Sequence, residues 1–246
     1  MSVAPTSVHR AREPHRSRWG LVALLVVLLG GVTVALLYHF DVFGGTSASS
    51  SSTSGGSGVV ATQTRNLPAF ESVELAGGNN VVIHVGAPQS VVVRADDNLL
   101  NRVTTDVRSG TLVIGNTPGS LTSKSPMSVA VTVPTLSALT LAGGGNIVVD
   151  GIKTESFTVI LSGSGNLSGN GTAGSLDVTL SGSGNAWFTQ LSADNVHAVL
   201  SGSGNVYVTA TKSLDASVPG SGTIIYAGYP QHVTKSVTGS GAITGS

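Results

Sequence analysis

The sequence predicts an all-β protein, a parallel β-helix built of coils of about 19–20 residues and preceded by one transmembrane α-helix. Three observations predict this fold. The pentapeptide SGSGN stands at 162–166, returns at 181–185 and returns again at 201–205. Apolar and polar residues alternate with period two between these copies, which is typical of strands. Near the N-terminus, a long apolar run without charge is typical of a membrane helix.

The N-terminal part of the chain has the charge pattern of a membrane anchor. Residues 1–19 form a basic tail with four arginines against one glutamate, and residues 20–38 carry no charge. At ~1.5 Å of helical rise per residue, this uncharged run spans about 28 Å, close to the ~30 Å hydrocarbon core. We therefore expect a transmembrane helix over residues 20–40. Arginine and lysine residues that flank a membrane segment remain on its cytoplasmic side. We therefore expect a protein of the cell membrane with a cytoplasmic tail and an extracytoplasmic C-terminal domain.

A cleaved secretory signal is the alternative for this segment. The apolar run exceeds the usual length of about 7–15 residues in such a signal. In addition, the bulky residues Tyr38-His39-Phe40 stand where small residues should precede a cleavage site. The sequence therefore favours an uncleaved anchor.

Composition limits what the exported part can do. Residues 41–65 are rich in serine and glycine, so we expect a flexible tether there. The chain has no cysteine, which excludes disulfides and thiolate chemistry. Of the 12 basic and 12 acidic residues, the tail holds four and one, so the remainder has eight minus eleven, a net charge of −3. This mildly acidic part lacks the basic surface of a nucleic-acid-binding protein, and we expect no nucleic-acid partner.

The repeats define a register that extends beyond the three identical copies. The apolar residue before each corner recurs in steps of 20, 19, 20, 18 and 19 residues, at Leu141, Leu161, Leu180, Leu200, Val218 and Val237. Four and two residues before the last five of these positions the side chains are apolar, apart from Lys235, so we expect them to face inward. Three residues before the same five positions stands a polar column, which should face water: Thr158, Asp177, His197, Asp215 and Thr234.

Each corner is followed by a second strand-like run, so we expect two or three short strands in each coil. One coil cannot close a core, whereas a stack of about five or six can. The corner glycines should supply positive φ angles and let neighbouring coils approach closely. One asparagine in each corner should form a ladder of side-chain amides along the stack. These structural ladder residues are Asn146, Asn166, Asn185 and Asn205.

The β-helix domain should cover residues 66–246, with irregular coils over 66–140 and regular coils over 141–246. A degenerate corner, LAGGNN, stands at 75–80. Strand-like runs separated by turn residues follow at 81–85, 91–94, 111–114 and 129–133. We expect this irregular part to cap one end of the stack.

The order of these segments resembles a known family. Besides the GSGN corners, the chain carries VVVRADDNLLNRV at 91–103, RSGTLVIGN at 108–116 and VAVTVPTLSALTLAGGGN at 129–146. Together they look like the head GIN domain of putative auto-transporter adhesins, over roughly residues 66–246. The resemblance implies a right-handed β-helix in the bacterial envelope and suggests adhesion, but it supplies no catalytic residue.

The glycine corners do not have the context of a nucleotide-binding loop, because neither a helix nor a Lys-Ser/Thr pair follows them. We therefore expect no cofactor. A carbohydrate-processing lyase or hydrolase is the main alternative function, and its chemistry needs converging acids. The strongest candidates are Asp177, His197 and Asp215, with the two aspartates about 10 Å apart across two coil steps of ~4.8 Å. We interpret this column as a solvated face, and we expect no metal and no catalytic residue there.

A second column, in the middle of the post-corner strand, is a better candidate for binding. It holds Val148, Ser168, Trp187, Tyr207 and Ile225. If the neighbouring residues point inward, Trp187 and Tyr207 stack outside, where flat rings suit sugars or a protein partner. We predict a non-catalytic module for binding, adhesion or assembly at the bacterial cell envelope. Its partners would be cell-wall or surface glycans or another envelope protein, and self-association through the last coil is a further alternative.

Overall fold

The chain divides into two compact units, residues 1–50 and 51–246, and the computed structural model describes residues 24–29, 32–37 and 54–246. In the first unit, the described residues form two antiparallel strands, β1 (Leu24–Leu29) and β2 (Val32–Leu37). The predicted helix over residues 20–40 is therefore not found in the described part of that segment. Among all described residues, no helix has the length and apolar character needed to cross a membrane. Valine, which occurs in both strands, and the threonine of β2 favour the extended conformation.

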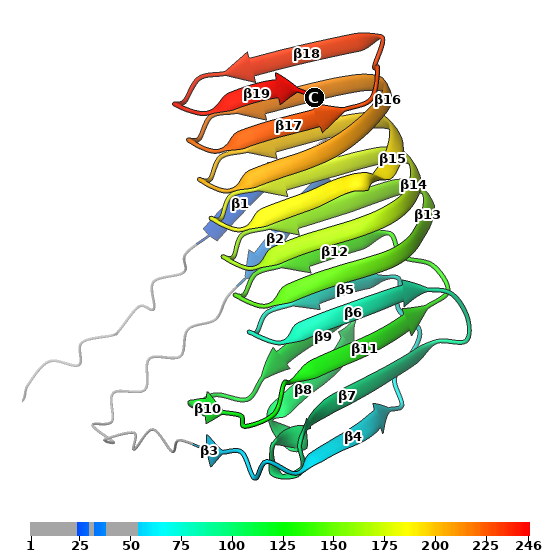
Figure 1. Cartoon of the computed structure of the whole chain (residues 1–246), viewed down its shortest axis with the longest axis vertical. Helices are drawn as coiled ribbons and strands as arrows, with labels where there is room; N and C mark the ends of the chain where they lie inside the picture. The colour runs from blue at the N-terminus through cyan, green and yellow to red at the C-terminus, as the bar shows by residue number, and fades with distance from the viewer. Residues whose placement is uncertain (1–23, 30–31, 38–53) are drawn as a thin grey trace, which may run out of the picture. The chain divides into compact units, whose positions relative to one another are not determined.

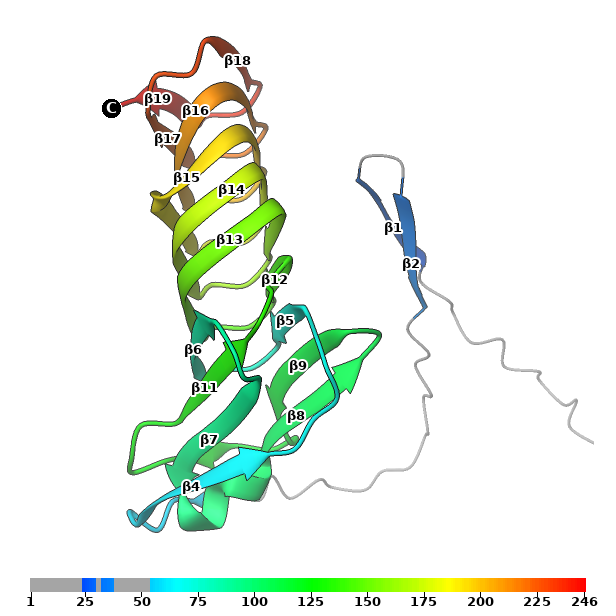
Figure 2. The ribbon, with the colours of Figure 1, turned by 90° about the vertical axis from the view of Figure 1, so that its right-hand side faces the viewer.

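The second unit is a β-solenoid in which each regular coil is one long strand wrapped around a core. These strands are β13 (Asn146–Leu161), β14 (Asn166–Leu180), β15 (Asn185–Leu200) and β16 (Asn205–Val218). Each strand begins at a corner asparagine and pairs in parallel with the strand of the next coil. Figures 1 and 2 show how each strand forms one face after the corner, curves, and returns as the opposite face. The predicted parallel stacking of coils is confirmed, while the right-handed sense stays a prediction.

The prediction of two or three short strands per coil is wrong, because hydrogen bonding continues around the curve. The four strands are 14 to 16 residues long and include the segment that joins the two faces. We call this segment the bend, and it comprises residues 150–155, 170–174, 189–195 and 209–213. Irregular register occurs there in every regular pair, for example between Ser168 and Asn170. The bend therefore absorbs the differences in coil length.

Alternate side chains of both faces point into one core, as the period-two pattern predicts. The column four residues before the apolar residue that precedes each corner is buried in the regular coils: Phe157, Leu176, Val196 and Leu214. On the other face, Ile147, Val149 and Phe188 are buried. The rings of Phe157 and Phe188 meet edge to face with centroids 6.3 Å apart, which ties the two faces together.

The corner glycines are explained by close approach and not by positive φ. None of the glycines in the SGSGN corners is among the described residues with positive φ. A Cβ added at Gly182 would instead overlap with the carbonyl oxygen of Gly163, one coil away, and the same clash recurs at Gly202 with Gly182. The backbone amides of Ser181 and Ser201 donate to the preceding coil, each over 2.9 Å. The expected positive φ is therefore wrong for these corners, and the expected close approach is confirmed.

The irregular end of the solenoid mixes parallel and antiparallel pairing. Its strands are β3 (Ser54–Gly55), β4 (Val60–Arg65), β5 (Ser72–Leu75), β6 (Asn80–Val85), β7 (Ser90–Asp96), β8 (Val103–Arg108), β9 (Thr111–Asn116), β10 (Leu121–Thr122), β11 (Ser128–Val133) and β12 (Ala138–Leu141). A 3-10 helix, η1 (Asp97–Arg102), follows β7. The strands β5 and β6 continue the coils beneath β12 and β13, whereas β4, β7 and β11 pair antiparallel. The four strand-like runs predicted in this part are confirmed as β6, β7, β9 and β11.

Two features of this end were not predicted from the sequence. The strand β4 lies within residues 41–65, which the sequence assigned to the tether, so the folded part begins before residue 66. Its alternating threonines favour a strand.

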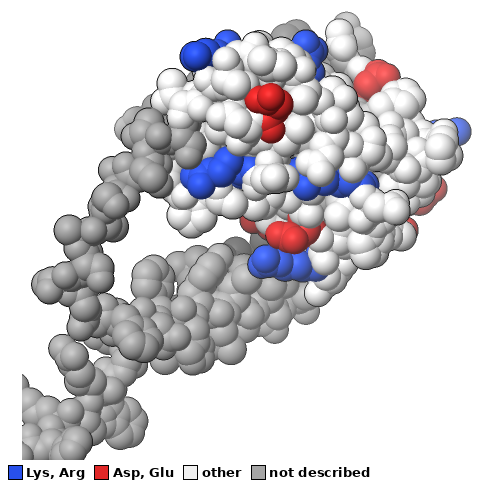
Figure 3. All heavy atoms as spheres, turned by 90° about the horizontal axis from the view of Figure 1, so that it is seen from below, with Lys and Arg blue, Asp and Glu red and all other residues white. Residues whose placement is uncertain are grey.

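The second unpredicted feature is the buried carboxylate of Asp96. It accepts hydrogen bonds from the amide of Lys124 (2.9 Å) and the hydroxyl of Ser123 (3.2 Å). Hydrogen bonds lower the pKa of Asp96, and the side chain of Ser125 contributes the largest effect. Figure 3 shows this end with charges of both signs interspersed on a mostly uncharged surface.

The opposite end is the coil of β17 (Thr223–Ala227), β18 (His232–Val237) and β19 (Ala242–Gly245). Val233 and Val237 are 42% and 45% exposed, although their columns are buried in the regular coils. Lys235, the misfit of the inward column, places its Nζ 4.6 Å from the centre of the Tyr226 ring. The ammonium group of Lys235 thus lies against an aromatic ring of β17.

Candidate ligand-binding face

The post-corner face of the solenoid carries one outward column of apolar and aromatic side chains. Val148, Ser168, Trp187, Tyr207 and Ile225 lie in register from β13 to β17. Their strand neighbours are buried, apart from the half-buried Tyr226, so this column points to solvent. The rings of Trp187 and Tyr207 stack, with centroids 6.3 Å apart and planes inclined by 25°. Trp187 is 40% exposed, which leaves much of the indole available for contact.

The column is interrupted at Ser168, and a hollow of about 180 Å³ lies there. In β14 the pair Ser168-Gly169 stands beside Val148-Val149 of β13, and Ser168 pairs with Trp187 of β15. On the inside, the ring of Phe188 occupies the space that Gly169 leaves, because a Cβ there would lie 2.9 Å from it. On the outside, no side chain fills the missing volume. The hollow is lined by Val148, Val149, Ser168, Gly169, Asn170, Trp187, Thr189 and Gln190.

Asn170 is held in place at the rim of this hollow. Its Oδ1 accepts a hydrogen bond from the amide of Gly151 over 3.0 Å. Its side chain also bonds Asp150, and this is the largest cause of a lowered pKa of that carboxyl. His84 adds a second contact, with its Nδ1 3.2 Å from Asp150 Oδ2. An amide fixed in this way presents its remaining hydrogen-bonding capacity in a defined direction.

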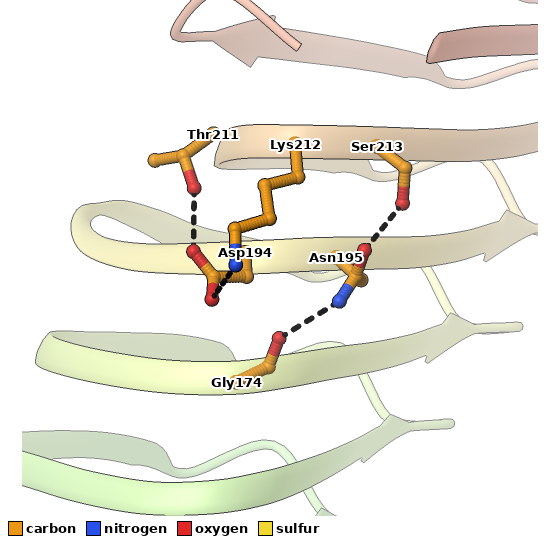
Figure 4. A network of polar contacts seen from close by, with 6 residues as sticks. All are labelled: Gly174, Asp194, Asn195, Thr211, Lys212 and Ser213. Carbon is orange, nitrogen blue, oxygen red and sulfur yellow. Dashed lines mark hydrogen bonds and ion pairs between the residues drawn. The ribbon is translucent and has the colours of Figure 1, made fainter. Parts of the chain in front are cut away.

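A second, larger hollow of about 690 Å³ lies further along the bend. Its lining is polar and includes Lys153, Glu155 and Asp194. Figure 4 shows the network beside it: Asp194 accepts from Lys212 Nζ (2.9 Å) and from the hydroxyl of Thr211 (2.8 Å). These two hydrogen bonds, the first being the larger cause, lower the pKa of Asp194. The carboxyl is therefore ionised and paired at neutral pH.

Asn195 completes the network on the same strand. Its Nδ2 donates to the carbonyl of Gly174 (3.3 Å), and its Oδ1 accepts from the hydroxyl of Ser213 (2.8 Å). Three successive coils are thus joined by side chains at the bend, as Figure 4 shows.

The structure brings Asp177, His197 and Asp215 into one register across β14, β15 and β16. The Nδ1 of His197 lies 3.5 Å from Asp215 Oδ2, with both side chains exposed. Within the described residues, no group of three or more histidine, aspartate or glutamate side chains is arranged to hold a metal ion.

The corner asparagines are joined by side-chain hydrogen bonds from coil to coil. Asn166 donates to Asn146 (3.0 Å), Asn185 to Asn166 (3.0 Å), and Asn205 to Asn185 (2.9 Å). The ladder extends one coil further than the sequence suggested, because Asn146 donates to Asn80 over 2.9 Å. The degenerate corner LAGGNN was the signal for this extension.

Two parts of the site were missed by sequence reasoning. The hollow had a signal, since β14 is the coil with small residues at both post-corner positions, Ser168 and Gly169. The pairing of His84 with Asp150 had none, because the two residues are 66 positions apart and meet only through the stacking of β6 on β13.

Comparisons with known proteins agree with this architecture. The family described as "Putative auto-transporter adhesin, head GIN domain" matches residues 69–230. No curated protein matches the sequence. A putative adhesin from Bacteroides fragilis has a similar fold, with 22% identity, a TM-score of 0.67 and coverage of 78% of this chain and 99% of its own.

Two further solved structures share the fold at lower similarity. A putative lipid binding protein from Parabacteroides distasonis has 21% identity and a TM-score of 0.52, covering 79% of this chain and 99% of its own. A putative adhesin from Parabacteroides merdae has 16% identity and a TM-score of 0.51, with the same coverage. At these identities the likeness concerns the fold alone.

Proposed function

Because the chain belongs to the family of putative auto-transporter adhesins with a head GIN domain, we propose that it is a non-catalytic, adhesin-like binding module of the bacterial cell envelope. The observation that carries this proposal is the stacked pair of Trp187 and Tyr207 on the post-corner face. Two stacked aromatic side chains on a sheet provide a large contact surface at small cost in conformational entropy. Exposed aromatic surface of this kind marks sites of association.

The chemistry around the aromatic pair supports binding without catalysis. The hollow beside Trp187 is lined by hydroxyl, amide and apolar groups, with no carboxylate and no histidine. Catalysis by a hydrolase or lyase requires a positioned acid or base at the reacting atom. The nearest large hollow contains Asp194, but Lys212 and Thr211 occupy this carboxylate. We therefore prefer a binding function to the carbohydrate-processing alternative.

Cell-wall or surface glycans are the ligands that this face fits best. Sugar rings present flat C–H faces to aromatic rings and hydroxyl groups to amides, and the face offers both. A related fold carries the name of a putative lipid binding protein, so a lipid is the competing ligand. The exposed apolar surface is interrupted by Ser168 and bordered by Asn170, which fits a polar ligand better than an acyl chain.

The proposal includes a location at the outer side of the cytoplasmic membrane. The uncharged residues 20–38 and the four arginines that precede them support attachment with the tail in the cytoplasm. Alkaline extraction of membranes tests this part: an attached chain stays in the pellet, and a peripheral chain is released.

The binding proposal is tested with the full chain and purified cell-wall polysaccharide in a co-sedimentation assay. Replacement of both rings, Trp187→Ala with Tyr207→Ala, should abolish co-sedimentation because the contact surface is removed. Tyr229→Ala is the matched control, since Tyr229 is 97% exposed and lies outside the aromatic column. Unchanged co-sedimentation of the double variant, at the same polysaccharide concentration, would contradict the proposal.

A further inference from the structure

The hollow beside Trp187 has the dimensions of a site for one small group. Its volume is about 180 Å³, and it is half open to solvent. A single sugar ring can enter such a space from the solvent side, and the rest of a longer ligand would lie outside it.

The lining selects for an uncharged ligand that donates and accepts hydrogen bonds. None of the lining residues carries a charge. One wall is the exposed indole of Trp187, and the opposite wall is Val148, which is 47% exposed. The amide of Gln190 offers donors and an acceptor, as sugar hydroxyls require, and the amide of Asn170 keeps one N–H and one lone pair beyond its bonds to Asp150 and Gly151. A charged ligand would meet no counter-charge in this lining.

The walls of the hollow are fixed by the fold. The space exists because Ser168 and Gly169 are small, and Gly169 must stay small since Phe188 and Ile152 lie within about 3.0 Å of the position of a Cβ. Asn170 is restrained by Gly151 and Asp150, as described above. Binding to such a preformed site costs little conformational entropy.

We propose that the hollow at Ser168 is a subsite for one ring of an uncharged glycan, stacked on Trp187 and hydrogen-bonded by the amides of Asn170 and Gln190. The inference rests on the proposed function and names its ligand class and point of contact. Tyr207, one coil further along and outside the lining of the hollow, stacks on Trp187 and supports the indole from the side away from the hollow.

The subsite is tested by the fluorescence of Trp187 in the full chain. The chain has two tryptophans, so Trp19→Phe leaves Trp187 as the single indole. The protein is held in a detergent without a sugar headgroup and titrated with cellotetraose, maltotetraose and chitotetraose. We expect a saturable change in fluorescence with at least one of them. In the Ser168→Leu variant, where leucine fills the hollow, binding of that sugar should be roughly tenfold weaker or lost.

Thr179→Leu is the matched control, because it adds the same side chain to the same strand on the opposite face. Its binding should equal that of the parent. The subsite is refuted if none of the three sugars changes the fluorescence, or if Ser168→Leu binds as tightly as Thr179→Leu. If the Trp187 and Tyr207 double variant loses cell-wall binding but Ser168→Leu keeps it, the result supports the proposed function and refutes the subsite. If both variants keep cell-wall binding, both proposals are refuted.

Discussion

The two turns of each coil, the corner and the bend, solve the same geometrical problem in different ways. At the corners the sequence repeats almost unchanged, and the backbones of successive coils pack so closely that Gly163, Gly182 and Gly202 admit no Cβ. At the bend the sequence varies, the register shifts, and Gly151 and Gly171 adopt positive φ angles of 81° and 129°. Glycine therefore serves close approach alone at the corner, whereas at the bend it also serves backbone conformation: Gly171 combines its positive φ with a Cβ position that would overlap with the carbonyl oxygen of Ile152.

This difference shows where to look for function in a repetitive protein. The repeated corner is constrained on all sides by its own copies, through backbone hydrogen bonds and the asparagine ladder. The bend and the strand leading into it are free to vary, and both hollows lie there. Repetition in this chain marks structure, and its interruption at Ser168-Gly169 marks the candidate site.

The comparison predicts its largest effect at a corner glycine. Gly182→Ala should lower the free energy of unfolding by about 3 kcal/mol or more, because the new methyl group overlaps with the carbonyl oxygen of Gly163 and the coils cannot separate without losing their hydrogen bonds. Urea unfolding followed by circular dichroism measures the loss.

Gly144→Ala is the control for this substitution. Gly144 stands in a corner but has open space around its Cβ position, and its equivalents in the next coils are Ser164 and Ser183. Its effect should stay within about 0.5 kcal/mol. Equal losses for the two variants would mean that close approach is not what selects glycine at the corner.

A smaller effect is expected from the asparagine ladder. Asn166→Ala removes the hydrogen bonds to Asn146 and from Asn185, so at about 1 kcal/mol each the loss should be about 2 kcal/mol. Asn195 also makes two side-chain hydrogen bonds, but it lies exposed at the bend, where water can replace them. Asn195→Ala should therefore cost about 1 kcal/mol or less in the same urea experiment. A cost at the bend equal to that at the corner would remove the distinction between the two turns.

Much of the corner was predictable from the sequence, because its signal is local and repeated. The spacing of Leu161, Leu180 and Leu200 sets the coil length, and the period-two pattern assigns each side chain to the core or to solvent. The ladder and the stack of Trp187 on Tyr207 then follow from register alone. By contrast, the long apolar run over residues 20–38 was read as a helix from its length and lack of charge, whereas the described residues within it form strands. Length and hydrophobicity alone do not fix the backbone conformation, because valine and threonine also favour strands.

The geometry of the bend was not predictable, because it depends on the number of residues that each coil has in this segment. A difference of one or two residues becomes a bulge between strands, and the sequence does not say on which strand it falls. The hollow had a local signal in the small residues Ser168 and Gly169, whereas the pair of His84 with Asp150 depends on which irregular strand stacks beneath β13. The bulges and this pair follow from packing between coils and not from the order of residues within one.

The smallest predicted effect concerns the ion pair of the bend and depends on pH. The hydrogen bonds from Lys212 and Thr211 lower the pKa of Asp194 in the folded protein below its ordinary value of 3.8. A lowered folded pKa means that the unfolded chain binds the proton more readily, so the stabilisation is present above pH 3.8 and is lost as pH falls through the folded pKa. The difference in urea midpoint between the parent and Asp194→Asn should therefore be largest near neutral pH and shrink toward about pH 3. In a Lys212→Ala background the same substitution should have a smaller effect at neutral pH. Lys212 donates the hydrogen bond that is the larger cause of the lowered pKa of Asp194, and this variant removes it. A difference that stays constant from about pH 7 to pH 3 would show that Asp194 acts at the bend through packing and neutral hydrogen bonds, and that its charge contributes nothing there.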